Sequence, residues 1–164
     1  MNDPSIININ STNEPSRPEI LAPAGGKKTF LAALAAGADA LYCGLKNFSA
    51  RMAAENFSID ELGPLTRLAH DRGKKVYIPI NTMIKSDELN SAGRLLDQLN
   101  RQVAPDALIV QDLAMISLAR QTGFSGEIHL STLANISFPA ALKLVRRLPE
   151  IRRVVLPREL SIDE

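Results

Sequence analysis

The stretch EILAPAGGKKTFLAALAAGADALYCG, residues 19–44, contains the pattern that decides the fold. A short apolar run at 19–23, which ends in Pro23, is the first expected strand. An alanine- and leucine-rich segment at 26–37 ends in Gly37, which is typical of a helix C-terminus. A second apolar run follows at 39–44. A strand, a helix and a strand joined by short turns predict a parallel β–α–β unit with a right-handed crossover.

The same alternation continues along the whole chain, and each expected strand is followed by a helix or by the start of one. The further strands are expected at 75–81, 106–111, 127–131 and 152–157, and the helices at 58–73, 86–100, 113–123 and 138–148, with a first helical turn at 161–164. A flavodoxin-like sheet needs about five strands and a (β/α)₈ barrel needs eight. We therefore expect an α/β fold, in which parallel (β/α) units form the N-terminal two-thirds of a TIM-like barrel, truncated after about six strands.

Local signals support this division of the chain. Ser58 is followed three residues later by Glu61, which is the spacing of a capping box at a helix start. Ser86 is a candidate N-cap for the helix at 86–100. The sequence DAL opens two of the expected strands, at 39–41 and at 106–108, which indicates repeated strand–helix units.

Composition bounds the class of protein. Hydrophobic residues make up 45% of the chain and charged residues 23%, as in an ordinary globular domain, and the net charge of +1 gives no whole-chain reason to expect a polyanion or an acidic membrane as partner. The single cysteine, Cys43, favours a reducing compartment, and no apolar run approaches a membrane span, so a cytoplasmic protein is expected. Residues 1–17 read as a disordered arm, and 18–164 as the partial barrel domain.

The strand at 127–131, EIHLS, predicts which side chains face a binding site. Because side chains alternate along a strand, Ile128 and Leu130 share one face, and His129 and Ser131 share the other. In a barrel the apolar pair would pack on the helices, and the polar pair would point inward near the C-terminal mouth. Other polar residues end strands or follow them in the sequence: Arg51, Asn81, Asp112, Arg158 and Glu159.

Simpler interpretations stand beside these. His129 and Ser131 lie about 6.5–7 Å apart along a strand, too far for a nucleophile–base hydrogen bond, and no GxSxG motif surrounds the serine. His129 could equally be a structural histidine, and Asp112 an N-cap. Asn135 or Ser137 is expected to cap the next helix. The stretch APAGGKKT at 22–29 could hold an anion, but a tight turn is favoured.

An ordered set of segments carries a resemblance to a known family. They are PEILAPAGGKKTFLAALAAGADALYCGLKNFSAR, INTMIKSDEL, PDALIVQDLAMI, IHLSTLAN and RVVLPRELS. In this order and spacing the chain, from about Pro18 to its end, resembles the N-terminal part of peptidase family U32, the collagenase-like proteins. The segments CGLKN, DLAM and VVLPRELSI look closest to the branch that hydroxylates a ribosomal RNA cytidine.

The resemblance implies an RNA-modifying protein that hydroxylates a nucleobase without oxygen, with ribosomal or transfer RNA as partner. It also implies a [4Fe–4S] cluster, whose cysteines would lie beyond residue 164, so this fragment alone is expected to bind no cluster or metal and to be inactive. We assign catalytic roles to His129, Glu159 and Asp112. We assign substrate binding to Arg51, Asn81, Ser131 and Arg158, and the two arginines could bind the carboxylates of a prephenate-like molecule.

Two alternatives remain open. The family name implies a peptidase with a peptide substrate, although the sequence contains neither HExxH nor a nucleophile elbow. The fragment could instead be a non-catalytic binding module. An incomplete barrel exposes strand edges, so self-association is expected, and no membrane partner is expected.

Overall fold

The computed structural model describes residues 17–46, 48–49 and 55–161. Within them, six parallel strands form one sheet in the order β1-β2-β3-β4-β5-β6, so each strand pairs with its neighbours in the sequence. The strands are β1 (Leu21–Ala24), β2 (Ala40–Cys43), β3 (Lys75–Ile80), β4 (Ala107–Val110), β5 (Glu127–Leu130) and β6 (Ile151–Val154). The expected α/β class and order of strands are confirmed; the expected arm lies outside the described residues except for Arg17.

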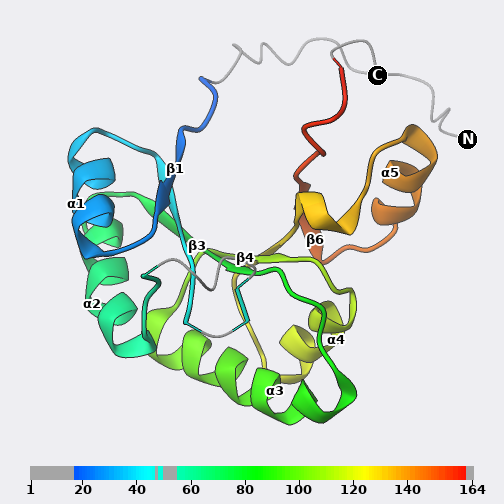
Figure 1. Ribbon diagram of the computed structural model, residues 1–164, viewed down its shortest axis with the longest axis horizontal. Helices are drawn as coiled ribbons and strands as arrows, with labels where there is room; N and C mark the ends of the chain where they lie inside the picture. Colours follow the sequence, from blue (N-terminus) through cyan, green and yellow to red (C-terminus); the bar gives the residue numbers. More distant parts are fainter. Residues whose placement is uncertain (1–16, 47, 50–54, 162–164) are drawn as a thin grey trace, which may run out of the picture.

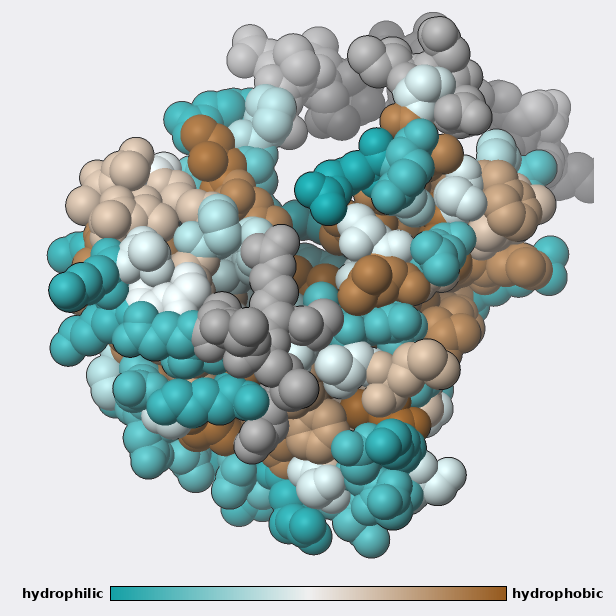
Figure 2. All heavy atoms as spheres, in the orientation of Figure 1, coloured by the Kyte–Doolittle hydropathy of each residue, from teal (hydrophilic) through white to brown (hydrophobic). Residues whose placement is uncertain are grey.

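Helices cover the outside of the curled sheet, and β1 and β6 form its two ends (Figure 1). The helices are α1 (Lys27–Ala35), α2 (Ile59–His70), α3 (Leu89–Gln98), α4 (Ala114–Gln121) and α5 (Pro139–Val145), with shorter turns at η1 (Ser86–Glu88), η2 (Leu99–Val103) and η3 (Thr132–Ala134). Figure 2 shows that the molecule is hollowed between the two ends of the sheet. The arrangement is part of a TIM-like barrel.

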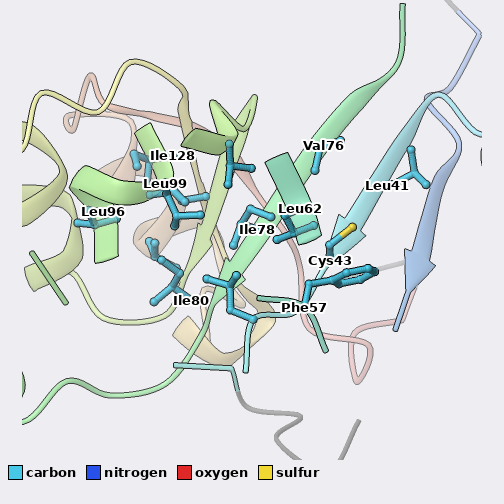
Figure 3. Packing of buried hydrophobic residues seen from close by; sticks show 14 of the residues in the cluster. Leu41, Cys43, Phe57, Leu62, Val76, Ile78, Ile80, Leu96, Leu99 and Ile128 are labelled. Carbon is cyan, nitrogen blue, oxygen red and sulfur yellow. The ribbon is translucent and has the colours of Figure 1, made fainter. Parts of the chain in front are cut away.

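The main core lies between the sheet and the helices. Val76, Ile78 and Ile80 alternate along β3 and belong to one buried cluster with Leu62 of α2 and Leu99 of η2 (Figure 3). The intervening Tyr77 belongs to a second, smaller buried cluster on the inner face, with Ala40 and Ala107. The alternation predicted from the sequence is therefore observed, because one face of each strand packs on helices and the other faces the lumen.

The two DAL segments have the same structural role, which explains their repetition. Asp39 precedes β2 and accepts a hydrogen bond from the backbone N–H of Ile20, before β1 (3.0 Å). Asp106 precedes β4 and accepts one from the backbone N–H of Val76, in β3 (2.7 Å). Each aspartate thus fastens its own strand to the preceding one, and His70 adds a contact to Asp106 (2.9 Å).

Helix α2 begins as predicted. The backbone N–H of Glu61 donates to the Ser58 hydroxyl (3.3 Å), and the N–H of Ser58 donates to the Glu61 carboxylate (2.8 Å). Two donors at the helix start are satisfied reciprocally, which is the capping box. The helix also contains Gly63 and Pro64. A Cβ at Gly63 would lie 2.8 Å from the carbonyl oxygen of Gln102, so glycine is required for this close packing of α2 on η2.

The prediction of one helix over residues 86–100 is wrong in detail. It is a 3₁₀ turn (η1), an α-helix (α3) and a π turn (η2) in succession, and Ser86 lies inside η1 rather than at a cap. The π turn ends at Ala104, whose φ is 50° and whose N–H donates to the carbonyl of Leu99 (2.8 Å). Among the described residues, no helix has the length and apolar content needed to cross a membrane.

Candidate functional site

A hollow of about 170 Å³ opens at the carboxyl ends of β1, β2 and β3, where sites form in barrels of this kind. We call it the mouth pocket. Small, polar and proline side chains line it. The lining residues are Pro23, Ala24, Gly25, Tyr42, Gly44, Ser49, Asn56, Pro79 and Asn81.

Backbone hydrogen bonds fix the wall of the mouth pocket. The N–H of Asn56 donates to the carbonyl of Gly25 (3.0 Å), and the N–H of Phe57 donates to the carbonyl of Gly44 (2.9 Å). A Cβ added at Gly44 would overlap the carboxamide oxygen of Asn56. Because Gly44 has no side chain, the buried Asn56 can lie against the end of β2 and line the pocket.

The stretch at 22–29 forms the tight turn that the sequence favoured. The N–H of Gly26 donates to the Thr29 hydroxyl (3.1 Å), and that hydroxyl donates to the carbonyl of Gly26 (2.8 Å), so Thr29 caps the start of α1. The Glu55 carboxylate lies against Gly26, where an added Cβ would overlap it. A carboxylate of the chain itself therefore lies beside this helix start.

The residues expected at the mouth separate into three groups. Asn81 follows β3, is half-buried and lines the mouth pocket. Arg158 and Glu159 are exposed in the turn after β6. Asp112 accepts the backbone N–H of Ala114 (2.9 Å) at the start of α4, and that of Ile84 (3.2 Å) from the loop after β3. The capping alternative for Asp112 is thus supported, and Arg51 lies outside the described residues.

His129 points inward as predicted, but it lies in a different group of side chains. Its Nε2 is 2.8 Å from a carboxylate oxygen of Glu127, the first residue of β5, and its ring meets that of Tyr77 edge to face at 5.0 Å. The Tyr77 hydroxyl donates to Glu19 (3.0 Å), which also accepts from Arg153 (2.8 Å). We call these five residues the inner polar network.

The inner polar network joins the two ends of the sheet. Glu19 precedes β1 and Arg153 belongs to β6, so their ion pair spans the lumen between the first and last strands. The Arg153 guanidinium also lies 5.6 Å from the centre of the Tyr77 ring. His129 is almost fully buried, at 1% exposure, and its Nε2 contacts the Glu127 carboxylate. This environment supports the structural interpretation of His129; a catalytic role for it stays a prediction.

Ser131 does not form a pair with His129. Its hydroxyl oxygen accepts the backbone N–H of Leu133 (3.2 Å) and caps η3. The expectation that Asn135 or Ser137 caps the next helix is wrong, because α5 begins with Pro139 and has Phe138 at its N-cap without a side-chain hydrogen bond. A substrate-binding role for the buried Ser131 stays a prediction.

Burial and hydrogen bonding shift the pKa values of the inner polar network. Burial lowers the pKa of His129 below 6.5, although Glu127 opposes the shift. The hydrogen bond from His129 lowers the pKa of Glu127. Burial alone would raise the pKa of Glu19, but the hydrogen bonds from Arg153 and Tyr77 hold it below its usual value. At neutral pH the network therefore contains a neutral histidine in contact with the Glu127 carboxylate.

These shifts predict an acid-sensitive fold with two separate steps. As pH falls below 6.5, the unfolded chain binds a proton that buried His129 resists, so stability is lost between 6.5 and the lowered pKa of the folded state. The stabilisation by Glu19 and Glu127 is complete above their unfolded pKa of 4.5 and is lost as pH falls through their lower folded values. Urea unfolding from pH 8 down to about pH 2 measures both steps, and H129Q removes the first step.

The cysteine of this chain does not fit an iron–sulfur cluster. Cys43 is the only cysteine in the sequence, and it is fully buried in the helix-facing core beside Leu41 and Phe57 (Figure 3). Burial raises the pKa of its thiol to about 12, whereas a cluster needs about four thiolates. Within the described part of the chain, no group of three His, Cys, Asp or Glu residues could hold a metal ion.

Comparison with known proteins identifies the family of this chain and agrees with its fold. The family model described as "Peptidase family U32" matches residues 25–164. The chain belongs to this family. A solved U32 peptidase has the same fold, with a TM-score of 0.67 at 14% identity, covering 85% of this chain and 58% of that one.

Relatives within family U32 have names of two kinds. A "Collagenase" of Porphyromonas gingivalis is 34% identical over 89% of this chain and 34% of its own length. In Escherichia coli, a "tRNA hydroxylation protein P" and a 23S rRNA 5-hydroxycytidine synthase are each 36% identical over 90% of this chain, covering 32% and 22% of their own lengths. The chain thus spans about a third or less of these U32 relatives.

Several residues that line the mouth pocket of this U32 protein were not identified from the sequence. Gly25, Gly44 and Asn56 were not predicted, because none of them is ionisable and none forms a known motif. A signal was present, since Gly25 and Gly44 each directly follow a strand. Glycine at that place allows another segment to approach the strand end closely.

Proposed function

We propose that this protein acts in the hydroxylation of a nucleobase in ribosomal or transfer RNA, as part of a longer U32 protein. The mouth pocket carries this proposal, because it combines proline and tyrosine side chains with amide groups at the strand ends where barrel enzymes bind substrates. The 36% identity to proteins named for tRNA and 23S rRNA hydroxylation supports it.

Within this proposal, the chain supplies a substrate-binding surface. Asn81 lines the pocket, while Arg158 and Glu159 follow β6 on the same side of the sheet, at the carboxyl ends of its strands. Any [4Fe–4S] cluster would be held by cysteines beyond residue 164, since the one thiol here is buried in the helix-facing core. Binding of a prephenate-like carboxylate would then fall to Arg158, which lies in the turn after β6 and not in the pocket lining.

Deletion of the gene tests the proposed activity. RNA from the deletion strain is digested to nucleosides and compared with the parent strain by mass spectrometry. We expect one hydroxylated pyrimidine nucleoside to disappear from ribosomal or transfer RNA, and to return when the intact gene is supplied on a plasmid. An unchanged nucleoside profile would remove hydroxylation from consideration.

Peptide hydrolysis is the second candidate, supported by the 34% identity to a protein named collagenase. The structure supports peptide hydrolysis less than hydroxylation, because His129 contacts Glu127 and the Ser131 hydroxyl caps η3, so the two do not form a nucleophile–base pair. Gelatin cleavage by the purified full-length protein tests it. If the protein is a peptidase, cleavage should persist through purification. It should also be lost in N81A, since Asn81 lines the pocket.

A further inference from the structure

Large apolar side chains are exposed at the carboxyl ends of the middle strands. They come from the segments that follow β3, β4 and β5, and their exposed fractions range from 41% for Leu89 to 76% for Met83. We call this set the apolar rim. Its members are Met83, Leu89, Leu113, Leu133 and Phe138.

Hydrogen bonds hold the segments of the apolar rim side by side. The Asp112 carboxylate accepts the backbone N–H of Ile84, from the segment after β3 (3.2 Å), while it also caps α4. The N–H of Ser131, directly after β5, donates to the carbonyl of Val110 at the end of β4 (2.8 Å). The three segments therefore form one continuous edge. Grouped apolar surface of this kind on a soluble protein marks an interaction site.

Two helix starts carry rim residues where a polar residue would stabilise the helix. Leu113 is the N-cap of α4 and Phe138 is the N-cap of α5, and neither side chain accepts a hydrogen bond there. Ser, Thr, Asp or Asn at this position would satisfy a free backbone N–H of the first turn. Residues that break such a local rule are expected where a surface has another role.

The charges along this edge indicate the chemistry of the partner. The segments 82–89, 111–113 and 131–138 all lie within the described residues. They contain one basic residue, Lys85, and three acidic residues, Asp87, Glu88 and Asp112. RNA gains affinity when Lys and Arg neutralise its phosphates, and this edge does not offer that balance. An apolar protein segment fits the rim better.

The strands that complete a barrel would not cover the apolar rim. In an eight-stranded barrel, two further strands lie between β6 and β1, which are the two ends of this sheet. The rim instead follows β3, β4 and β5, in the middle of the sheet. Covering it requires an element that lies across the mouth of the barrel.

A longer U32 chain can supply this element itself. The part shared with this chain is 34% of the Porphyromonas gingivalis relative and 32% of the Escherichia coli tRNA hydroxylation protein. A segment of the same chain is tethered, so its effective concentration at the rim is on the order of millimolar. A separate copy would instead lose its free translation and rotation on binding.

We propose that the apolar rim is the docking surface for a lid, an apolar segment of the longer U32 chain from outside residues 1–164. The lid lies across the carboxyl ends of β3, β4 and β5 and limits the access of water to the mouth. The choice of occupant rests on the proposed function only where that makes this chain one part of a longer protein. It does not depend on which reaction is catalysed.

Photo-cross-linking of the purified full-length protein identifies the occupant. In one variant, p-benzoylphenylalanine replaces Phe138, which adds a photoreactive ketone to the ring already at the rim. In the matched control it replaces Ser117, which is exposed on α4 away from the strand ends. After irradiation, mass spectrometry maps the joined peptides. We expect position 138 to join one apolar segment of the same chain outside residues 1–164, and position 117 to join none.

A second substitution tests whether this proximity reflects docking on the rim. L113D places a charge on the rim and should lower the cross-link yield from position 138 by about fivefold or more. S117D adds the same charge elsewhere on α4 and should leave the yield unchanged. Equal yields in L113D and S117D overturn the proposal. So do cross-links from position 138 to a second copy or to RNA, or no cross-link at all.

The outcomes separate this inference from the proposed function. If position 138 joins the same chain as expected while gene deletion leaves RNA nucleosides unchanged, the lid stands and the proposed hydroxylation fails. If deletion removes a hydroxylated nucleoside but position 138 joins nothing in its own chain, the activity stands and the lid fails.

Discussion

Replacement of His129 by alanine lowers the free energy of unfolding by about 3 kcal/mol. The ring is 1% exposed and packs edge to face on Tyr77 at 5.0 Å, so its removal leaves a cavity inside the lumen. The change also removes the hydrogen-bond partner of Glu127. Urea unfolding at pH 7.5, followed by circular dichroism, measures the loss.

The second histidine provides the control. His70 lies on the surface, where it contacts Asp106 with 38% of its side chain exposed, so H70A should cost no more than about 1 kcal/mol. Equal effects of H129A and H70A would contradict the structural role that we assign to the inner polar network.

Replacement of Gly63 by valine lowers the free energy of unfolding by about 3 kcal/mol. A Cβ at this position meets the Gln102 carbonyl oxygen at 2.8 Å, and that oxygen belongs to the backbone of η2, which cannot move aside as a side-chain end could. The valine must push α2 away from η2 and disturb the core around Leu62 and Leu99. Thermal unfolding of G63V measures the effect.

Gly93 in α3 gives the opposite expectation. A Cβ there meets only the end of Leu118 at 3.6 Å, an ordinary contact, so G93A should stabilise the protein by up to about 1 kcal/mol through the higher helix propensity of alanine. If G63V melts at the wild-type temperature, the close packing of α2 on η2 is not as described.

Much of the fold follows from patterns within short stretches of sequence. The alternation of Val76, Ile78 and Ile80 with Tyr77 predicted the two faces of β3, and Ser58 with Glu61 predicted the start of α2. Such features depend on neighbours in the sequence and on the two-residue period of a strand. The division of the segment at 86–100 into three helical pieces does not depend on sequence neighbours alone. Its last piece, η2, packs against Gly63 of α2, which is distant in the sequence.

The same distinction explains the site. Strand alternation predicted that His129 points inward, but its partner Tyr77 and their neighbours Glu19 and Arg153 come from three other parts of the chain. Position along the lumen decides whether an inward polar residue meets substrate or fills the barrel interior, and periodicity does not contain that information. The mouth pocket depends on backbone contacts of Gly25 and Gly44, which carry no chemical signature.

The measurement that tests the central claim most directly is nucleoside mass spectrometry of RNA from strains carrying G25L or A32L in the chromosomal gene. The account predicts that the hydroxylated pyrimidine lost on gene deletion is also lost in G25L and retained in A32L, because only the first leucine enters the mouth pocket. Equal amounts of that nucleoside in both strains, with both proteins present at wild-type levels, would contradict it.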